Sequence, residues 1–440
     1  MSFSTKNKLQ SIFNKQKGFQ WQARQTTAQQ RIKKLLNLKN AILTRTQDLV
    51  EAANRDFAMT SMTAEQQIYS VTSAIDFTVQ HLEEWMHPDR VENTQDGEAY
   101  ILYESRGCVC IFGTWNSPMS VTIHPLLDAL AAGNCVLIKP SEFNPAYNQI
   151  LEDIIESVFD EQEVAFVQGE ADVSEQLLKL PFDHFFFTGS PRVGKIVMRE
   201  AAEHLATVTL ELGGKSPVII DKGYNPFKAA QTIVFGKVMM AGQFCIAPDY
   251  LFVHEDDLTG FARAFQQMTL GMLYDDGKLR TTERTQIVND AHYYRIKGLF
   301  EDAIEKGATV LSGGIFDDEN RLIEPTLLGN IIPDMRIADE EIFGPLTFVK
   351  TYKDVSEAIR HIQQNPKPLA LYIYSEDEHF QQQVLRTTSS GGVTVNGIFM
   401  HNTHLHLPFG GVNNSGSGNF HGIHGFKTFS HQRAVYKVLS

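Results

Sequence analysis

The segment 238–250, "VMMAGQFCIAPDY", carries one cysteine, Cys245, directly after Gly, Gln and Phe. A second cysteine is not close by in the sequence, so the spacing does not indicate a metal or disulfide pair. A thiolate here would be a nucleophile, whereas a thiol among apolar residues is more often an inert core side chain. The segment alone leaves both interpretations open.

Two further polar side chains lie at the ends of expected strands. In "LELGGKSP", Glu211 follows an apolar run, where a carboxylate is paired, exposed or perturbed for acid–base chemistry. In "FGTWNSP", the amide of Asn116 can donate to a developing oxyanion, or it can simply form a turn before Ser-Pro. Each residue is therefore a candidate with a structural alternative.

Two other strand ends carry residues that suit a dinucleotide. "FFFTGSPRVGKIV" puts Gly189 and Gly194 at a strand–helix junction, where backbone N–H groups and the helix dipole favour an anion. "VLIKPSE" ends a strand with Lys139 and Glu142, which can hydrogen-bond ribose hydroxyls beyond the strand end. An ordinary turn and a solvated strand end are the alternatives.

The elements that must position these residues alternate along the chain. Residues up to about 85 have helical periodicity, and short apolar strands then alternate with helices to about residue 399. This alternation predicts an α/β fold with doubly wound parallel sheets in two domains, joined near "ELGGKSP". The C-terminal run is strand-like, and we expect it to pair outside the main sheets.

Bulk composition excludes several classes of protein. The chain has 440 residues, 42% of them hydrophobic, and a formal net charge of −13, which disfavours nucleic acid as a partner. Four cysteines do not form a disulfide framework, so we expect a reducing, cytoplasmic environment. No apolar run approaches the ~18 residues of a membrane span, and the N-terminus lacks a signal-peptide core. We therefore expect no membrane anchor.

Taken together, the motifs resemble those of the aldehyde dehydrogenase superfamily. "ELGGKSP", "GQFCIAPDY", "EEIFGP" and "LPFGGVNNSG" occur in that family's order, together with "FGTWNSP", "IKPSE" and "FTGSPRVGK". The resemblance covers nearly the whole chain. The "APDY" after Cys245 and "HGFKTFSHQRAV" near the end resemble the class 3 branch, which includes fatty, aromatic and coniferyl aldehyde dehydrogenases.

The resemblance implies a role for each candidate. Cys245 would attack the aldehyde carbon, and Asn116 with the N–H of Cys245 would stabilise the oxyanion. Hydride transfer to the nicotinamide would leave a thioester, and Glu211 would activate the water that releases the acid. The implied cofactor contacts are Trp115, Lys139, Ser141, Glu142, Gly189, Ser190, Val193, Gly194, Leu212, Glu341 and Phe343.

The same resemblance implies a division of the chain and an assembly. Residues 1–85 and 105–210 would form a dinucleotide-binding domain of Rossmann-like topology, and residues 211–399 a Rossmann-like catalytic domain. Residues 86–104 and 400–440 would form a small β oligomerisation arm. Because the exposed strand edges of such an arm favour pairing, we expect a homodimer.

The expected reaction is NAD(P)-dependent oxidation of an apolar aldehyde, aliphatic or aromatic, to its acid. Glu142 should repel a 2′-phosphate, which favours NAD, and NADP stays open. Transfer of the acyl group to coenzyme A or phosphate, a non-catalytic protein and a cysteine hydrolase are the alternatives. We expect no metal, although histidines crowd "MHNTHLH" and "FHGIH".

Several residues depart from the family pattern. Thr114 stands where Pro usually precedes Trp-Asn, and Ser117 where an aromatic residue is common. Phe244 occupies a position often held by Thr, while Met240 and Asn413 replace more usual polar and Gly residues. None of them removes a catalytic role. We expect several to line the substrate pocket, with the ring of Phe244 partly replacing the one lost at Ser117.

Overall fold

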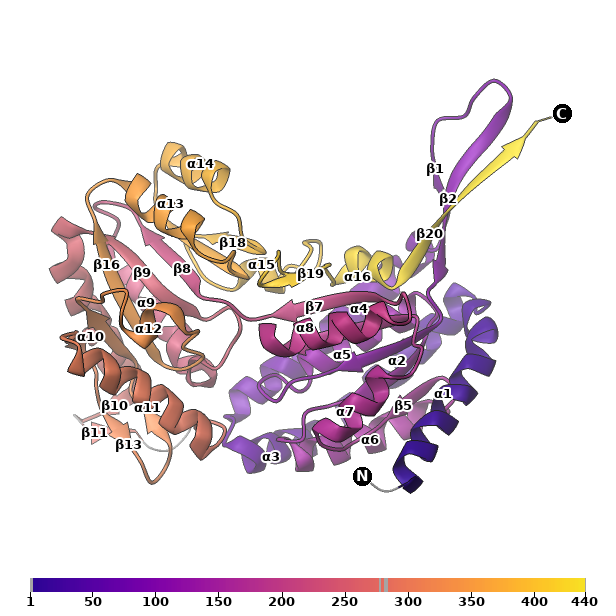
Figure 1. Cartoon of the computed structure of the whole chain (residues 1–440), viewed down its shortest axis with the longest axis horizontal. Coiled ribbons are helices and arrows are strands. Elements are labelled where there is room, and N and C mark those ends of the chain that lie inside the picture. The colour runs from indigo at the N-terminus through magenta and orange to yellow at the C-terminus, as the bar shows by residue number, and fades with distance from the viewer. Residues whose placement is uncertain (1–2, 277, 281–283, 440) are drawn as a thin grey trace.

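The structure, a computed structural model, describes residues 3–276, 278–280 and 284–439. Figure 1 shows two lobes, each built on a β-sheet, and an arm that projects from one of them. The α/β class with parallel, Rossmann-like sheets is therefore confirmed. Within the described residues, no helix combines the length and the apolar character needed to cross a bilayer.

The first lobe contains a six-stranded sheet, over the described residues, in the order β19-β7-β6-β3-β4-β5. Its parallel strands are β3 (Cys108–Phe112), β4 (Cys135–Lys139), β5 (Val164–Phe166), β6 (His184–Gly189) and β7 (Thr207–Leu212). Because β4 and β5 lie on one side of β3 and β6 and β7 on the other, the winding reverses at β3. Such a reversal leaves a crevice at the carboxyl ends of the strands.

Helices cover both faces of this sheet. The helices are α1 (Phe3–Arg24), α2 (Ala28–Thr44), α3 (Thr46–Phe57), α4 (Ser61–Trp85), α5 (Ser120–Ala131), α6 (Pro145–Val158), α7 (Ala171–Leu178) and α8 (Pro191–Ala202). Side chains alternate along β3: Cys108 and Cys110 pack with α1 and α7, whereas Val109 and Ile111 pack with α2 to α6. Cys108 and Cys110 are thus buried thiols on one face.

The second lobe contains a seven-stranded sheet in the order β12-β15-β16-β9-β8-β17-β18 among the described residues. Its strands are β8 (Ser216–Ile220), β9 (Pro248–His254), β12 (Thr309–Ser312), β15 (Thr326–Gly329), β16 (Leu346–Tyr352), β17 (Ala370–Tyr374) and β18 (Gly392–Val395). Helices α9 (Pro226–Val238) and α10 (Leu258–Leu273) pack on one face. Helices α11 (Asp290–Glu305), α13 (Val355–Gln364) and α14 (Glu378–Thr387) pack on the other.

The chain passes from the first sheet to the second over residues 213–215, between the end of β7 and the start of β8. This position agrees with the junction that the sequence predicts near "ELGGKSP". Short elements complete the lobes: η1 (Met239–Gly242), η2 (Glu255–Asp257), β10 (Tyr274–Asp275), β11 (Lys278–Leu279), β13 (Phe316–Asp317), β14 (Leu322–Ile323), α12 (Arg336–Asp339) and α15 (Met400–Thr403).

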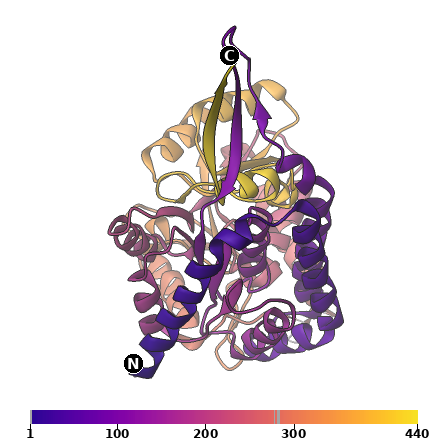
Figure 2. The same ribbon diagram turned by 90° about the vertical axis from the view of Figure 1, so that its right-hand side faces the viewer.

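The arm is a three-stranded antiparallel sheet of β1 (Asp89–Arg90), β2 (Gly97–Ser105) and β20 (Ser430–Val438). The register of β2 and β20 runs from Gly97↔Val438 to Ser105↔Ser430, and Figure 2 shows the pair extending beyond the body. The C-terminal run thus pairs outside the main sheets, as predicted. Before it, β19 (Gly416–Ser417) pairs with β7, and α16 (Gly422–Thr428) packs on α4 and α5.

Phe186, in the middle of β6, ties the C-terminal segment to the first sheet. Its buried ring lies 5.1 Å from the Phe420 ring and 5.8 Å from the Phe429 ring, centroid to centroid.

We expect Phe186→Ala to lower the free energy of unfolding by about 3–5 kcal/mol, because it leaves a cavity. Urea unfolding followed by circular dichroism measures the loss. The exposed Phe227 is the control, and an equal loss for Phe227→Ala would contradict the assignment.

Candidate active site

The candidate residues come from opposite ends of the two sheets. In the first sheet they lie at or just after the carboxyl ends of β3, β4, β6 and β7. In the second sheet they precede the amino ends: Cys245 lies before β9, and Glu341 and Phe343 lie before β16. The short crossing at residues 213–215 joins these two edges. The site therefore lies between the lobes.

Cys245 lies in a tight turn that follows strained backbone. Met240 and Ala241 both have φ of 52°, in the left-handed region that non-glycine residues rarely adopt, and Gly242 has φ of 67°. A side chain at Gly242 would collide with the carbonyl of Gly344. The turn then closes with Ala247 N–H donating to the Phe244 carbonyl at 2.9 Å, which leaves Cys245 half-buried.

Gln243 holds this turn in place, a role that the sequence analysis missed. Its side chain is 1% exposed. Its Nε2 donates to the carbonyls of Met240 at 3.0 Å and Gln286 at 2.9 Å, and its Oε1 accepts from Val288 N–H at 3.0 Å. The position of Gln243 directly inside "GQFC" was the available signal. Its side chain fixes the approach of the chain to the cysteine.

Asn116 points its amide nitrogen at residues 240–247, the turn that carries Cys245, which we call the cysteine loop. Nδ2 donates to the Gln243 carbonyl at 3.1 Å, and Oδ1 accepts from the Thr114 hydroxyl at 2.6 Å. Because a carbonyl can only accept, the Gln243 carbonyl fixes the amide nitrogen on its side, and the Thr114 hydroxyl then donates to the amide oxygen. Thr114 is one of the departures from the family pattern, and only the structure shows what it contacts.

Glu211 is buried without a countercharge. It lies in β7 beside Thr188 of β6, is 3% exposed, and its Oε1 has no hydrogen-bond partner among the described residues. Burial raises the pKa of this carboxyl well above its usual range. Burial therefore disfavours the ionised form of this side chain, which lies close to the cysteine loop.

The Cys245 thiol has a raised pKa, first because of burial and then because the carboxylates of Glu211 and Glu341 repel a thiolate. Both carboxyl groups therefore lie near the sulfur. The backbone N–H groups of Cys245 and Ile246 act in the opposite direction as hydrogen-bond donors. The sulfur thus lies near two carboxyl groups and two backbone donors, and the balance of these effects favours the neutral thiol.

The strand end after β4 presents Lys139, Ser141 and Glu142. Lys139 is buried, and burial lowers the pKa of its ammonium group. Its Nζ donates to the Pro140 carbonyl at 2.8 Å and lies 3.5 Å from Glu142 Oε2. The Ser141 hydroxyl accepts from Phe143 N–H at 3.3 Å. The Lys139 ammonium group and the Glu142 carboxylate, which can both hydrogen-bond ribose hydroxyls, thus lie at the end of β4.

The junction of β6 and α8 is shaped for an anion. Ser190 caps α8, its hydroxyl accepting from Val193 N–H at 3.4 Å. A side chain at Gly194 would come within 2.7 Å of a Leu212 methyl carbon, and one at Gly189 would meet the Phe187 ring. The glycine at 194 allows this close approach of helix α8 to strand β7, and the helix N-terminus favours a phosphate. These residues fit a dinucleotide pyrophosphate.

Glu341 and Phe343 reach the site from the segment before β16. The N–H of Gly214 hydrogen-bonds the Glu341 carboxyl group, and burial raises the pKa of Glu341 to about 7. The Phe343 ring lies 5.7 Å from the Trp115 ring, which also contacts His292 at 5.6 Å. The indole ring of Trp115 therefore joins the segment that carries Phe343 to the end of β3.

The structure places the candidate residues in two connected groups. One group lies around the cysteine loop and consists of Cys245 itself with Glu211, Asn116 and Glu341. The other group, Lys139 and the glycines of 189–194, lies along the edge of the first sheet. Among the described residues, the His, Cys, Asp and Glu side chains form no group of three or more arranged to hold a metal ion. His401, from the histidine-rich segment, instead hydrogen-bonds the Thr394 hydroxyl at 2.7 Å.

Comparison with known proteins identifies the family. The sequence profile of the aldehyde dehydrogenase family matches residues 2–435 of the chain. The chain therefore belongs to the aldehyde dehydrogenase family, as the resemblance of its motifs implies.

Individual relatives agree with this assignment. The chain is 38% identical to the 4,4'-diaponeurosporen-aldehyde dehydrogenase of Staphylococcus aureus, over 92% of this chain and 88% of that protein. It is 39% identical to the rat (Rattus norvegicus) "Aldehyde dehydrogenase, dimeric NADP-preferring", over 84% and 81%. The substrate-bound structure of Staphylococcus aureus AldH superposes with a TM-score of 0.93 at 37% identity, over 98% and 94%.

The raised pKa of Glu211 predicts how its replacement affects stability. The folded protein keeps the Glu211 proton above the pH at which the unfolded chain releases it, near ~4.3, so this carboxyl lowers stability as the pH rises above that value. Gln cannot ionise. We therefore expect the difference in Tm between Glu211→Gln and the native protein to grow in favour of the variant from pH 5 to pH 8.

Thermal unfolding at several pH values measures this difference. The matched control is Glu319→Gln, which changes an exposed carboxylate in the same way. A Glu211→Gln difference that stays constant across the pH range would contradict the raised pKa.

Proposed function

We propose that this chain oxidises an apolar aldehyde, aliphatic or aromatic, to the carboxylic acid with NAD or NADP, using Cys245 as the nucleophile. The observation that carries the proposal is the cysteine loop. There a half-buried thiol lies near the Glu211 carboxyl group, and the Asn116 amide donates to the Gln243 carbonyl two residues before it. Membership of the aldehyde dehydrogenase family supports the same reaction.

The residues divide the chemistry between them. The Cys245 thiol loses its proton to solvent and its sulfur attacks the aldehyde carbon, and the resulting oxyanion is stabilised by the Asn116 Nδ2–H and the Cys245 N–H. The sulfur-bound carbon loses a hydride and becomes a thioester. Glu211, once deprotonated, takes a proton from water, which attacks the thioester and releases the acid and the thiol. Because the pKa of Glu211 is raised, this last step should be faster at higher pH.

The cofactor would bind along the edge of the first sheet. Lys139 and Glu142 would hold the adenosine ribose, with Ser141 beside them. The pyrophosphate would lie on the N-terminus of α8, at residues 189–194, against Leu212. Glu341, Phe343 and Trp115 would hold the nicotinamide half. When bound, the dinucleotide supplies the acceptor for the hydride.

The choice between NAD and NADP depends on Glu142. The Glu142 carboxylate opposes a 2′-phosphate, which favours NAD. Its partner Lys139, 3.5 Å away, partly neutralises it, so NADP remains the second candidate. The rat relative named as NADP-preferring supports keeping both.

Other acyl acceptors and other cysteine chemistry are less well supported. An enzyme that transfers the acyl group to coenzyme A or phosphate must keep water from the thioester, whereas Glu211 is placed as a base. A cysteine hydrolase needs a histidine beside the thiol. The groups that affect the pKa of Cys245 are carboxyl groups and backbone N–H donors, not a histidine.

The walls around the cysteine favour an apolar substrate. The Phe244 ring lies 5.4 Å from the Phe399 ring, edge to face, and the Ser117 hydroxyl lies 3.9 Å from the sulfur of Met240. Phe244 directly precedes Cys245 in the chain, so its ring supports an apolar substrate, whereas Ser117 and Met240 are each only 2% exposed.

We also propose the division of the chain and its assembly. Residues 1–85 and 105–210 would be the cofactor-binding domain, 211–399 the catalytic domain, and 86–104 with 400–440 the arm. A homodimer is supported by β20, which lies at the edge of the arm sheet with Tyr436 and Val438 exposed. The four free thiols support a cytoplasmic location.

The order of steps predicts different defects for two variants. Cys245→Ala should lose activity entirely, because no thioester forms. Glu211→Gln should still release NADH in a first burst but slow steady turnover by ~10²–10⁴-fold, because thioester hydrolysis lacks its base. Stopped-flow absorbance of NADH separates the burst from turnover. Turnover that accelerates on addition of coenzyme A or phosphate would instead support an acyl-transferring enzyme.

The pocket predicts an effect on substrate choice. Phe244→Thr removes the ring that packs on Phe399, so the ratio of kcat/KM for hexanal and benzaldehyde should change by about tenfold or more. The KM for NAD should stay within about twofold, because Phe244 is not a proposed cofactor contact. Phe227→Thr, at an exposed ring, is the control. An unchanged ratio would place Phe244 outside the substrate pocket.

A further inference from the structure

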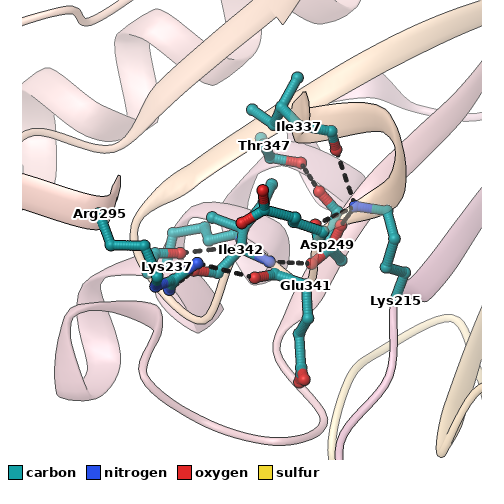
Figure 3. A network of polar contacts seen from close by, with 10 residues as sticks. Lys215, Lys237, Asp249, Arg295, Ile337, Glu341, Ile342 and Thr347 are labelled. Atoms are coloured by element: carbon teal, nitrogen blue, oxygen red, sulfur yellow. Dashed lines mark hydrogen bonds and ion pairs between the residues drawn. The ribbon is translucent and has the colours of Figure 1, made fainter. Parts of the chain in front are cut away.

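The segment 340–345, "EEIFGP", carries Glu341 and Phe343 but has no regular secondary structure. Side chains from other elements hold its backbone, as Figure 3 shows. Arg295 donates to the carbonyls of Glu341 at 3.1 Å and Ile342 at 2.6 Å. The buried Lys237 donates to the Gly344 carbonyl at 3.2 Å. The position of this segment is therefore set by residues distant in sequence.

An ion pair between Lys215 and Asp249 lies at the centre of this network. Lys215 Nζ is 2.5 Å from Asp249 Oδ1. The same Nζ donates to the carbonyls of Ile337 and Glu340, each at 2.9 Å. The second carboxylate oxygen of Asp249, Oδ2, accepts from Ile342 N–H at 2.9 Å. The pair thus holds backbone groups on both sides of Glu341.

The two partners are joined in sequence to the proposed catalytic residues. Lys215 is four residues after Glu211, and Asp249 is four residues after Cys245. The Asp249 carbonyl also accepts from the Thr347 hydroxyl in β16 at 3.0 Å. One ion pair therefore connects the segments that carry Glu211, Cys245 and Glu341.

Burial distinguishes this pair from an ordinary surface ion pair. The side chains of Lys215 and Asp249 are 17% and 3% exposed. A buried ion pair contributes little net stability, because desolvation offsets the attraction, but its fixed hydrogen bonds can select one geometry. A second pair, Lys222–Asp256, joins the far ends of the same strands β8 and β9 and is 61% exposed on both sides. It offers a control of matching chemistry and spacing.

We propose that Lys215 and Asp249 are positioning residues for the nicotinamide half of the cofactor site. Their ion pair fixes the segment 340–345 against the start of β8 and β9, so that Glu341 faces the dinucleotide near Cys245. Glu341 extends away from the pair toward the residue 213–214 backbone, while its neighbours in sequence are bonded to the pair (Figure 3). The inference depends on the proposed role of Glu341 in holding the cofactor.

Three variants test the pair. In Asp249→Asn, the single amide oxygen cannot serve Lys215 and Ile342 N–H together, and the amide nitrogen repels whichever donor it faces. Lys215→Met removes the bonds to Ile337 and Glu340. The double variant Lys215→Met/Asp249→Asn removes both charges, so no unpaired charge remains buried. In all three, we expect the segment 340–345 to lose its fixed position.

The measurement is NADH binding to the full-length chain without substrate, by fluorescence titration, together with Tm. We expect the dissociation constant for NADH to rise at least tenfold in all three variants, including the double variant. Lys222→Met/Asp256→Asn should stay within twofold. Tryptophan fluorescence should also change in the cofactor-free variants, because Phe343 packs on Trp115.

The variant Glu341→Ala shows how much NADH binding depends on the Glu341 side chain itself, and the pair variants are compared with it. If it weakens NADH binding and the pair variants do not, the positioning role is overturned while the proposed function stands. If Glu341→Ala leaves NADH binding unchanged, its proposed role fails, and this inference fails with it.

Two other outcomes also overturn the inference. One is native affinity in the double variant, which would mean that the partners only neutralise each other. The other is fewer binding sites at an unchanged dissociation constant, which would indicate misfolding alone.

Discussion

The structure depends on one constraint: the carboxyl edge of the first sheet and the amino edge of the second must meet. The chain crosses between the sheets over only residues 213–215, so neither edge can shift far from the other. Glu211 lies on one side of this crossing and Lys215 at its end. The ion pair of Lys215 with Asp249 then locks the crossing to the strand that follows Cys245. The catalytic and cofactor residues share this single junction.

The junction concentrates features that stability alone would not favour. Glu211 is buried with an unpartnered carboxyl oxygen, and Met240, Ala241 and Phe343 have left-handed backbone angles. Each feature costs folding free energy, which the packed sheets on either side have to offset. In return, a thiol and two carboxyl groups lie close together, and burial raises the pKa of all three. A strained and poorly solvated junction of this kind suits chemistry more than it suits structure.

Much of the fold and part of the site could be predicted from the sequence. Alternating strands and helices indicate two parallel α/β sheets, and the run "ELGGKSP" marks the crossing between them. Glycines at 189 and 194 predict a close strand–helix junction, and a collision of any side chain with Leu212 gives the reason at Gly194. The contacts of Gln243 with Gln286 and Val288, and of Asp249 with Lys215 and Ile342, were not predictable, because they join segments that are distant in the sequence.

The sequence by itself determined the family, the α/β class and the residue types that can do the chemistry, because these follow from local periodicity and motif spacing. Only the tertiary structure decided that the second sheet contributes its amino ends, that the Gln243 carbonyl orients the Asn116 amide, and that burial raises the pKa of Glu211. The physical reason is that charge, burial and hydrogen-bond direction depend on neighbours that folding brings together. Cys245 and Glu341 are 96 residues apart in the chain, yet the carboxylate of Glu341 raises the pKa of the Cys245 thiol.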